Sequence, residues 1–174
     1  MSASTAAMLR WAETPADLAL ARTLFVEYAR WLAVDLCFQG FDNELATLPG
    51  AYAPPRGRLL LAGVRTAAFG CIALRPLEMQ RACGGAAAGA HDGAAIGEVK
   101  RLYVQPAHRG EGWGRRLVEA VIAEARAIGY RELKLDTLDW MGEARKLYAN
   151  LGFRESPAYY DNPLPGAVYM ELAL

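Results

Sequence analysis

Three glycines spaced two residues apart, Gly110, Gly112 and Gly114, follow a short run of apolar residues. Glycine lets a backbone come close to a ligand, and the first N–H groups of a helix lack intrahelical acceptors and carry the positive end of its dipole. From Trp113 onward, apolar residues recur at the spacing of a helix. This order of strand, glycine-rich turn and helix predicts an anion site, with phosphate as the leading candidate.

The sequence around the turn narrows the choice of phosphate ligand. A Walker loop ends in Gly-Lys followed by Ser or Thr, whereas Gly114 is followed by Arg115 and Arg116. A dinucleotide fingerprint expects an acidic residue about 20 positions further on. Asp136 stands close to that offset, so spacing alone leaves the dinucleotide reading open. However, that fingerprint usually opens a domain of several repeated βαβ units, and this sequence shows one.

Two motifs resemble the GCN5-related N-acetyltransferase (GNAT) family. Arg109 to Gly114 resembles the family's R/Q-x-x-G-x-G/A signature, and Ala144 to Phe153 (ARKLYANLGF) is similar to its A-x-x-L-Y-x-x-x-G-F helix. With the strand between them, they cover most of residues 98–153. The first 90 residues match the family only in the order of their elements. The ending YYDNPLPGAVYMEL is similar to bacterial family members whose substrates are unknown.

The resemblance implies an acetyl-CoA-dependent N-acetyltransferase. It places the pyrophosphate of acetyl-CoA on the backbone amides of the glycine turn, with two arginines adding positive charge. It places the pantetheine arm between two splayed parallel strands, along the backbone of the first. The expected cofactor-binding residues are Leu102, Tyr103, Val104, Arg109, Gly110, Glu111, Gly112, Trp113, Gly114 and Arg115. Arg116 is expected on the solvent-exposed face of the helix.

Acetyl transfer from a thioester to an amine needs a proton donor for the departing thiolate and a neutral amine for attack. The resemblance assigns the donor to Tyr148, which falls at the matching place in the second motif. Core packing at helical spacing with Leu147 and Leu151 is the alternative explanation of this tyrosine.

Two carboxylates are candidates for the group that accepts the proton of the amine. Glu98 stands where relatives that acetylate histones keep a glutamate base, and a partly buried carboxylate suits this role. The alternative is a surface residue paired with Lys100 or Arg101. Asp136, on the facing strand, is the second candidate, and could instead bind the ammonium of the substrate.

Four aromatic residues are expected to line the acceptor side if the family architecture holds: Phe38, Phe41, Tyr159 and Tyr160. A pocket of this kind favours the primary amine of a small molecule or an amino acid as acceptor. Two alternatives stay open, a protein N-terminal or lysine acetyltransferase and a non-catalytic sensor that binds acyl-CoA.

Hydrophobic periodicity predicts the elements that must position these residues. The pattern indicates an α/β (α+β mixed) fold in one domain, residues 1–174. The resemblance implies a mixed, mostly antiparallel sheet, a central parallel βαβ pair splayed to hold acetyl-CoA, and helices on both faces. Residues 35–42 are expected to form a second short helix or part of the pocket. Residues 81–95, rich in glycine and alanine, are expected to form a surface loop.

Composition limits the remaining function classes. Lys and Arg number 19, as do Asp and Glu, so no net charge attracts nucleic acid or an anionic membrane. The 3 cysteines are widely spaced, as is typical of reduced apolar residues, and no metal site is expected. With no signal peptide and no apolar run of about 18 residues, we expect a cytoplasmic protein. Its partner is then a small-molecule amine, and the family resemblance also allows a homodimer.

Overall fold

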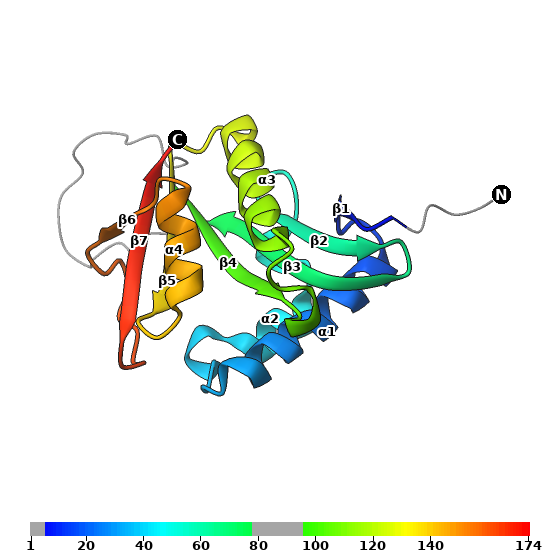
Figure 1. Cartoon of the computed structure of the whole chain (residues 1–174), viewed down its shortest axis with the longest axis horizontal. Coiled ribbons are helices and arrows are strands. Elements are labelled where there is room, and N and C mark those ends of the chain that lie inside the picture. Colours follow the sequence, from blue (N-terminus) through cyan, green and yellow to red (C-terminus); the bar gives the residue numbers. More distant parts are fainter. Residues whose placement is uncertain (1–5, 78–95) are drawn as a thin grey trace.

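The structure is a computed structural model that describes residues 6–77 and 96–174. Within these residues the strands form one seven-stranded sheet in the order β1-β2-β3-β4-β5-β7-β6 (Figure 1). The strands are β1 (Met8–Trp11), β2 (Arg58–Val64), β3 (Ala67–Pro76), β4 (Ile96–Val104), β5 (Glu132–Leu138), β6 (Arg154–Ser156) and β7 (Ala167–Ala173). β4 and β5 pair in parallel, and the other described neighbours pair antiparallel. This sheet confirms the fold class expected from the sequence.

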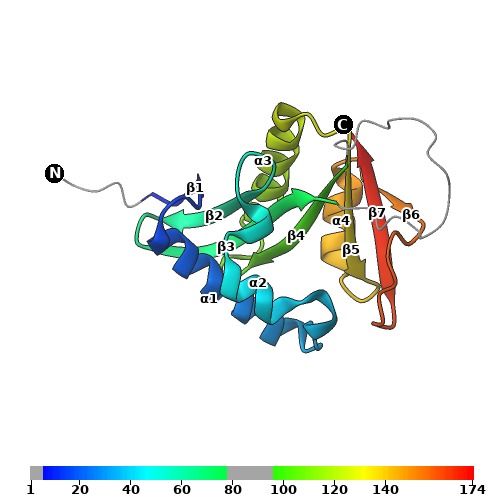
Figure 2. The ribbon, with the colours of Figure 1, turned by 180° about the vertical axis from the view of Figure 1, so that it is seen from behind.

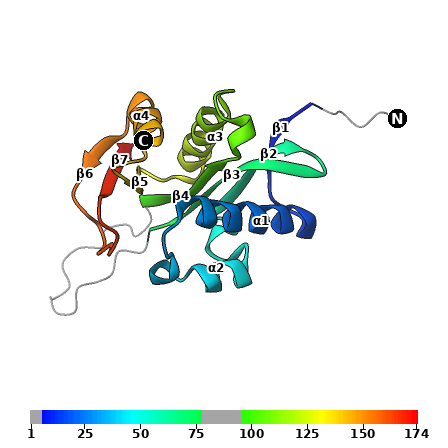
Figure 3. The same ribbon diagram turned by 60° about the horizontal axis from the view of Figure 1, so that its bottom comes forward.

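Helices cover both faces of the sheet. The helices are α1 (Pro15–Leu32), α2 (Phe41–Thr47), α3 (Trp113–Ile128) and α4 (Gly142–Asn150), with short 3₁₀ segments η1 (Cys37–Gln39), η2 (Gly50–Tyr52) and η3 (Pro106–His108). α1 and α2 lie on one face, as Figure 2 shows from behind, and α3 and α4 lie on the other (Figure 3). None of the helices in the described residues is long and apolar enough to cross a membrane.

Helix α1 begins where the sequence predicts. The Thr14 hydroxyl accepts a hydrogen bond from the Asp17 N–H (3.1 Å), and the Asp17 carboxylate accepts one from the Thr14 N–H (3.2 Å). This capping box satisfies N–H groups that the first helical turn leaves without partners. Ala33 adopts a left-handed conformation and ends the helix. In the sequence, Thr14-Pro15-Ala16-Asp17 offers an N-cap hydroxyl, a proline for the first helical position and an acid for the first turn, which predicts the helix start that the structure has.

Strand β2 is apolar on both faces because helices cover both. Leu59 and Leu61 belong to a buried cluster with Phe25 of α1, whereas Leu60 belongs to a cluster with Leu117 of α3. Successive side chains of a strand point to opposite faces, so the three leucines serve two cores. The central strands are thereby held between two helical layers, which fixes the position of β4 relative to α1 and α3.

Residues 35–42, for which a short helix or a pocket wall was expected, form η1 and the start of α2. Gln39 of η1 also lines a cavity beside β4, and a role of this segment in a substrate pocket stays a prediction. The loop expected over residues 81–95 lies outside the described residues. Phe153 precedes β6, and the strand itself begins at Arg154.

Candidate active site

The two parallel strands separate partway along their length. Their pairing runs from Ile96 opposite Glu132 to Glu98 opposite Lys134 and ends there. Beyond this point β4 and β5 diverge, as Figure 1 shows at the centre of the sheet. A cavity lies in the opening, and its wall includes Asp136 of β5. Because β5 has moved away, the edge of β4 that faces the cavity has no strand partner there.

A bulge in β4 contributes to this opening. The register with β3 shifts between Cys71 and Ala73, so one extra residue of β4 is accommodated. Arg101 is the residue with a left-handed conformation in this strand (φ 58°). Leu102, expected to contact pantetheine, lines the cavity. Tyr103, for which the same contact was expected, lies opposite Cys71 of β3.

Val104, the last of the three residues expected to contact pantetheine, is paired with β3 at Gly70. The contacts of all three with a cofactor stay predictions, of which Leu102 has the most direct access to the cavity.

The glycine turn forms an open cradle at the start of α3. Gly110 and Gly112 have φ values of 83° and 82°, which L side chains rarely adopt, and a Cβ at either position would meet no atom within 4 Å. The first hydrogen bond of the helix runs from the Arg116 N–H to the Gly112 carbonyl (3.1 Å). The preceding N–H groups of the helix therefore have no intrahelical acceptor and are available to an anion.

The third glycine has a different role. A Cβ on Gly114 would lie 3.4 Å from the Leu147 side chain of α4. This distance is an ordinary contact, so α3 and α4 lie close together here and the position has room for an alanine as well. Trp113, expected as a cofactor residue, is mostly buried in the core on the same side.

The charged side chains of the turn differ in their direction. The Arg109 guanidinium lies over the Trp31 ring at 4.6 Å, and its Nε donates to the Val104 carbonyl (2.9 Å). Arg115 is exposed and pairs with Glu119 one helical turn away (2.8 Å). Both arginines are exposed, and a phosphate-binding role stays a prediction for both.

The remaining side chains of the turn pack against aromatic groups. Glu111 accepts a hydrogen bond from the Trp113 indole N–H (3.0 Å). Arg116 is exposed, as expected from the sequence, with its guanidinium 4.7 Å from the centre of the Trp113 ring. Both contacts leave the backbone amides of the turn uncovered by these side chains.

Tyr148 reaches the cavity from α4. The residue is buried, its ring makes an edge contact with Phe153 (5.5 Å), and it lines the cavity. Burial raises the pKa of the Tyr148 phenol well above its ordinary value. The phenol is thus neutral and carries its proton over the physiological pH range, as a proton donor requires.

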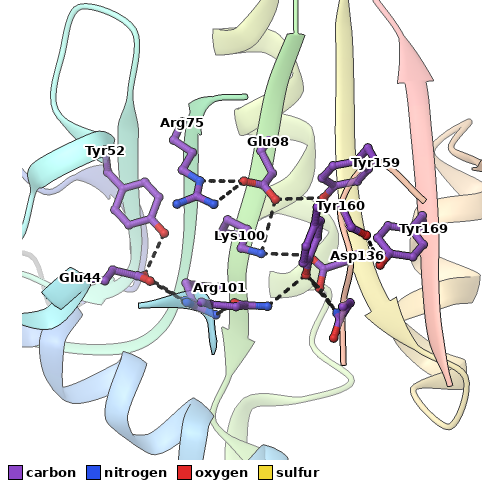
Figure 4. Close-up of polar contacts among 12 residues, drawn as sticks. Glu44, Tyr52, Arg75, Glu98, Lys100, Arg101, Asp136, Tyr159, Tyr160 and Tyr169 are labelled. Atoms are coloured by element: carbon purple, nitrogen blue, oxygen red, sulfur yellow. Dashed lines mark hydrogen bonds and ion pairs between the residues drawn. The ribbon is translucent and has the colours of Figure 1, made fainter. Parts of the chain in front are cut away.

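Glu98 is buried in a network of polar side chains (Figure 4). Arg75 donates to one carboxylate oxygen (2.7 Å), and the Tyr159 hydroxyl donates to the other (2.9 Å). The Lys100 ammonium lies 3.4 Å from the second oxygen. Glu98 is thus not the exposed surface residue that was the alternative reading, and in the described part of the chain it does not belong to the cavity wall.

Asp136 of β5 does line the cavity. Lys100 donates to one of its carboxylate oxygens (2.9 Å) and the Tyr160 hydroxyl to the other (2.9 Å), as Figure 4 shows. Burial raises the pKa of Asp136, but the charge of Lys100 and the hydrogen bonds from Lys100 and Tyr160 outweigh burial and hold it below its ordinary value. Asp136 is therefore a carboxylate at neutral pH.

The four aromatic residues expected at the acceptor side are not all on the cavity wall. Tyr159 and Tyr160 direct their hydroxyls to the carboxylates of Glu98 and Asp136 instead. Phe41 lies beneath the Arg101 guanidinium (5.2 Å). The side chain of Phe38 lies outside the described residues. The aromatic loop therefore stabilises the network of carboxylates beside the cavity.

Sequence reasoning named Lys100 and Arg101 as possible partners of Glu98 but did not predict them as buried cations of this site. Lys100 lies on the same face of β4 as Glu98, and this alternation was a usable signal. Arg101 is held by Glu44 of α2, with its Nε donating to Oε1 (2.9 Å), and by Gln39 (2.9 Å). Gln39 in turn donates to the Tyr160 hydroxyl (3.2 Å). No local sequence pattern predicts these contacts, because the partners are distant in sequence.

Comparison with known proteins identifies the class. A family model described as an acetyltransferase (GNAT) domain matches residues 56–155. A protein of Schizosaccharomyces pombe described as an uncharacterized N-acetyltransferase is 37% identical over 161 residues, 92% of this chain and 90% of that protein. The chain belongs to the GNAT family of acetyltransferases and is an acyltransferase by that membership.

Solved structures share the fold. An acetyltransferase from Streptococcus agalactiae superposes with a TM-score of 0.74 at 20% identity, covering 97% of this chain and 98% of that one. A GNAT family acetyltransferase from Brucella melitensis, solved in complex with acetyl-CoA, gives 0.66 at 23% identity and covers 97% and 88%. These likenesses confirm the fold that the two sequence motifs predicted.

Proposed function

We propose that this protein uses acetyl-CoA to acetylate the primary amine of a small molecule or amino acid. The observation that carries the proposal is the cavity between the diverging strands β4 and β5. Tyr148 from α4 and Asp136 from β5 both line this cavity, so a proton donor and a proton acceptor face the same space.

The residues present fit acetyl-CoA as the cofactor. The open cradle of Gly110 and Gly112 at the start of α3 suits a pyrophosphate, since no atom lies within 4 Å of where a Cβ of either glycine would stand and the first N–H groups of the helix are without intrahelical acceptors. The free edge of β4 beyond Glu98 suits an arm with amide groups. When bound, acetyl-CoA supplies the acetyl group as a reactive thioester.

The chain supplies the proton transfers. The Tyr148 hydroxyl keeps its proton because burial raises its pKa, and donates it to the sulfur that leaves. Asp136 is a carboxylate on the cavity wall and receives a proton from the amine, directly or through water. Glu98 stays a candidate base, but among the described residues Asp136 lines the cavity and Glu98 does not, so we assign Asp136 first.

The acceptor side of the cavity supports a small amine over a protein. Gln39 of η1 donates to the Tyr160 hydroxyl (3.2 Å), and the Asn162 amide also donates to this hydroxyl (3.0 Å). The Gln39 contact joins the α1–α2 side of the molecule to the loop before β7, across the divergence of the strands, and the Asn162 contact lies within that loop. An extended peptide would need an open groove at this place, whereas a small amine needs only a pocket.

The proposal is tested by acceptor-stimulated release of CoA. Purified protein with acetyl-CoA would be incubated with lysine, spermidine or phenethylamine, and separately with peptides that carry a free N-terminus or an internal lysine. We expect faster CoA release with at least one small amine, and an acetylated product by mass spectrometry. Release with peptides alone would favour protein acetylation, and tight acetyl-CoA binding without any release would favour the sensor.

A further inference from the structure

A second phenol reaches the cavity from the face of the sheet opposite to Tyr148. Tyr28 of α1 lines the same cavity, although it belongs to the layer that covers the other side of the sheet. Its ring packs against Trp31 (6.4 Å) and, edge to face, against Tyr103 (6.0 Å). The packing of these aromatic rings fixes where the phenol stands.

The hydroxyls of Tyr28 and Tyr148 differ from those of the tyrosines around them. Tyr52 donates to Glu44, Tyr159 to Glu98 and Tyr160 to Asp136. Over residues 6–77 and 96–174, by contrast, no hydrogen bond to the hydroxyl of Tyr28 or Tyr148 is found. Two phenols on opposite walls of one cavity are therefore free to bond a ligand.

The charged groups near the cavity are already paired with one another. The Asp136 carboxylate is paired with the Lys100 ammonium (2.9 Å). The Glu44 carboxylate is paired with the Arg101 guanidinium, with Nη2 2.6 Å from Oε2. An incoming amine thus finds no carboxylate without a cation beside it. A neutral hydroxyl can receive an N–H of the amine without disturbing either ion pair.

The surroundings keep the Tyr28 phenol neutral. Burial raises the pKa of Tyr28 to about 12, with Arg101 lowering it and Asp136 raising it by smaller effects. Tyr28 lines the cavity together with Lys100, Arg101 and Asp136. A neutral phenol offers two lone pairs and one O–H, so it can accept from an amine and donate to another group.

Resting on the proposed function, we propose that the Tyr28 hydroxyl binds the acceptor amine and positions it on the α1 wall of the cavity, opposite Tyr148. It accepts a hydrogen bond from one N–H of the amine. The two phenols then divide the work, since Tyr148 serves the sulfur that leaves and Tyr28 serves the nitrogen that attacks. The family motifs lie in α3 and α4, so this residue belongs to the part of the chain where acceptor specificity can vary.

The test is Tyr28→Phe, which removes the hydroxyl and keeps the packed ring. Tyr130→Phe is the matched control, because the Tyr130 hydroxyl is bonded to the Arg56 carbonyl (3.0 Å), and Tyr130 does not line the cavity. With the amine of the panel (lysine, spermidine or phenethylamine) that releases CoA fastest, Tyr28→Phe should raise the KM for the amine about tenfold. The KM for acetyl-CoA should match that of the wild type and of the control, and the melting temperature of Tyr28→Phe should match that of the wild type.

The outcomes separate this inference from the proposed function. If no panel amine stimulates CoA release by the wild-type protein, the proposed function fails and the inference fails with it. If the wild type turns over and Tyr28→Phe leaves the KM for the amine unchanged, the inference alone is overturned and Tyr28 is a packing residue. A rise in the KM for acetyl-CoA instead would make Tyr28 a cofactor residue and would equally overturn the inference.

Discussion

The Tyr148 hydroxyl is suited to donate a proton because its surroundings are apolar. The ring packs against Phe153, and burial rather than a charged partner sets the direction of its pKa. Packing and chemistry are therefore not alternatives at this position. The contacts that Tyr148 makes as a core residue are also what keep its phenol protonated.

Tyr148→Phe separates these two contributions, because it keeps the ring and deletes the proton. We expect kcat for CoA release to fall by roughly 10²-fold or more, with the KM for acetyl-CoA and the melting temperature close to the wild-type values. Steady-state kinetics and thermal unfolding provide both readings. Wild-type turnover in a stable Phe variant would reduce Tyr148 to core packing.

Asp136 and Glu98 can be distinguished by the pH dependence of the rate. Because Lys100 holds the pKa of Asp136 below its ordinary value, this carboxylate stays ionised at every pH of a normal assay. Asp136→Asn should therefore lower the rate most at low pH, where few amine molecules are neutral. The loss should shrink as the pH approaches the pKa of the amine, since free neutral amine no longer needs the base.

The pH–rate profile of Asp136→Asn should be compared with that of Glu98→Gln. If Glu98 only holds Arg75 and Tyr159 in place, its variant should show a pH-independent offset or none. A pH-dependent loss in Glu98→Gln together with a parallel offset in Asp136→Asn would reverse the assignment. Acetyl-CoA binding, followed by calorimetry, should survive both substitutions because the glycine turn is separate from both carboxylates.

Among the elements, β4 carries the most unusual local structure. A non-glycine residue at positive φ costs roughly 1–2 kcal/mol, and Arg101 is held there by its ion pair with Glu44. The pair spans 57 positions of the sequence, from α2 to the bulge. Tertiary contacts of this kind can stabilise a conformation that the local sequence disfavours.

Substitutions of Arg101 should reveal this conformation. Arg101→Ala and Arg101→Gly both leave the mostly buried Glu44 without its cation and should lower the free energy of unfolding by about 3 kcal/mol or more. Arg101→Gly should lower the free energy of unfolding by about 1 kcal/mol less than Arg101→Ala does, because glycine accepts a positive φ. Urea denaturation gives both values.

Arg154 of β6 is the matched control for this comparison, since it is exposed in an ordinary strand. The Arg154→Gly variant should be less stable than Arg154→Ala, because glycine loses more conformational freedom on folding. If the Gly and Ala variants had the same order of stability at Arg154 and at Arg101, this would contradict the role assigned to the left-handed conformation.

The glycine turn is tested at the element scale by Gly112→Asp. Bound acetyl-CoA should raise the melting temperature of the wild type, and the new carboxylate at the helix start should abolish that shift. Gly129→Asp, at the other end of α3, is the control, because Gly129 also has a positive φ (99°) and no atom within 4 Å of where a Cβ would stand. The Gly129→Asp variant should be less stable than the wild type, and acetyl-CoA should still raise its melting temperature. An unchanged shift in Gly112→Asp would remove the anion site.

The sequence predicted the elements better than the site because elements depend on local chemistry. Thr14 with Asp17 marked the start of α1, and Gly129 marked the end of α3. Periodicity also placed the parallel pair of strands. The burial of Glu98 depends instead on Arg75 and Tyr159, which are 23 and 61 positions away in the chain. No rule based on sequence spacing predicts contacts between residues at such separations.

At the scale of the whole molecule, the sheet consists of two parts that meet at few positions. The strands β1 to β4 join β5 to β7 through the parallel pairing that ends at Glu98. Beyond it, polar contacts cross the gap, including Lys100 to Asp136 and Gln39 to Tyr160. The cavity exists because these contacts, rather than a continuous ladder, hold the two parts beside each other (Figure 4).

Hydrogen exchange measured by mass spectrometry, with and without acetyl-CoA, tests most directly whether this divergence holds the cofactor. We expect slower exchange in peptides that cover residues 99–104 and 110–116, which include the free edge of β4 and the start of α3. Peptides from β2 and from the first half of α1 should exchange as before. Acetyl-CoA binding that leaves residues 99–104 and 110–116 unprotected, or that protects another surface instead, would contradict the account.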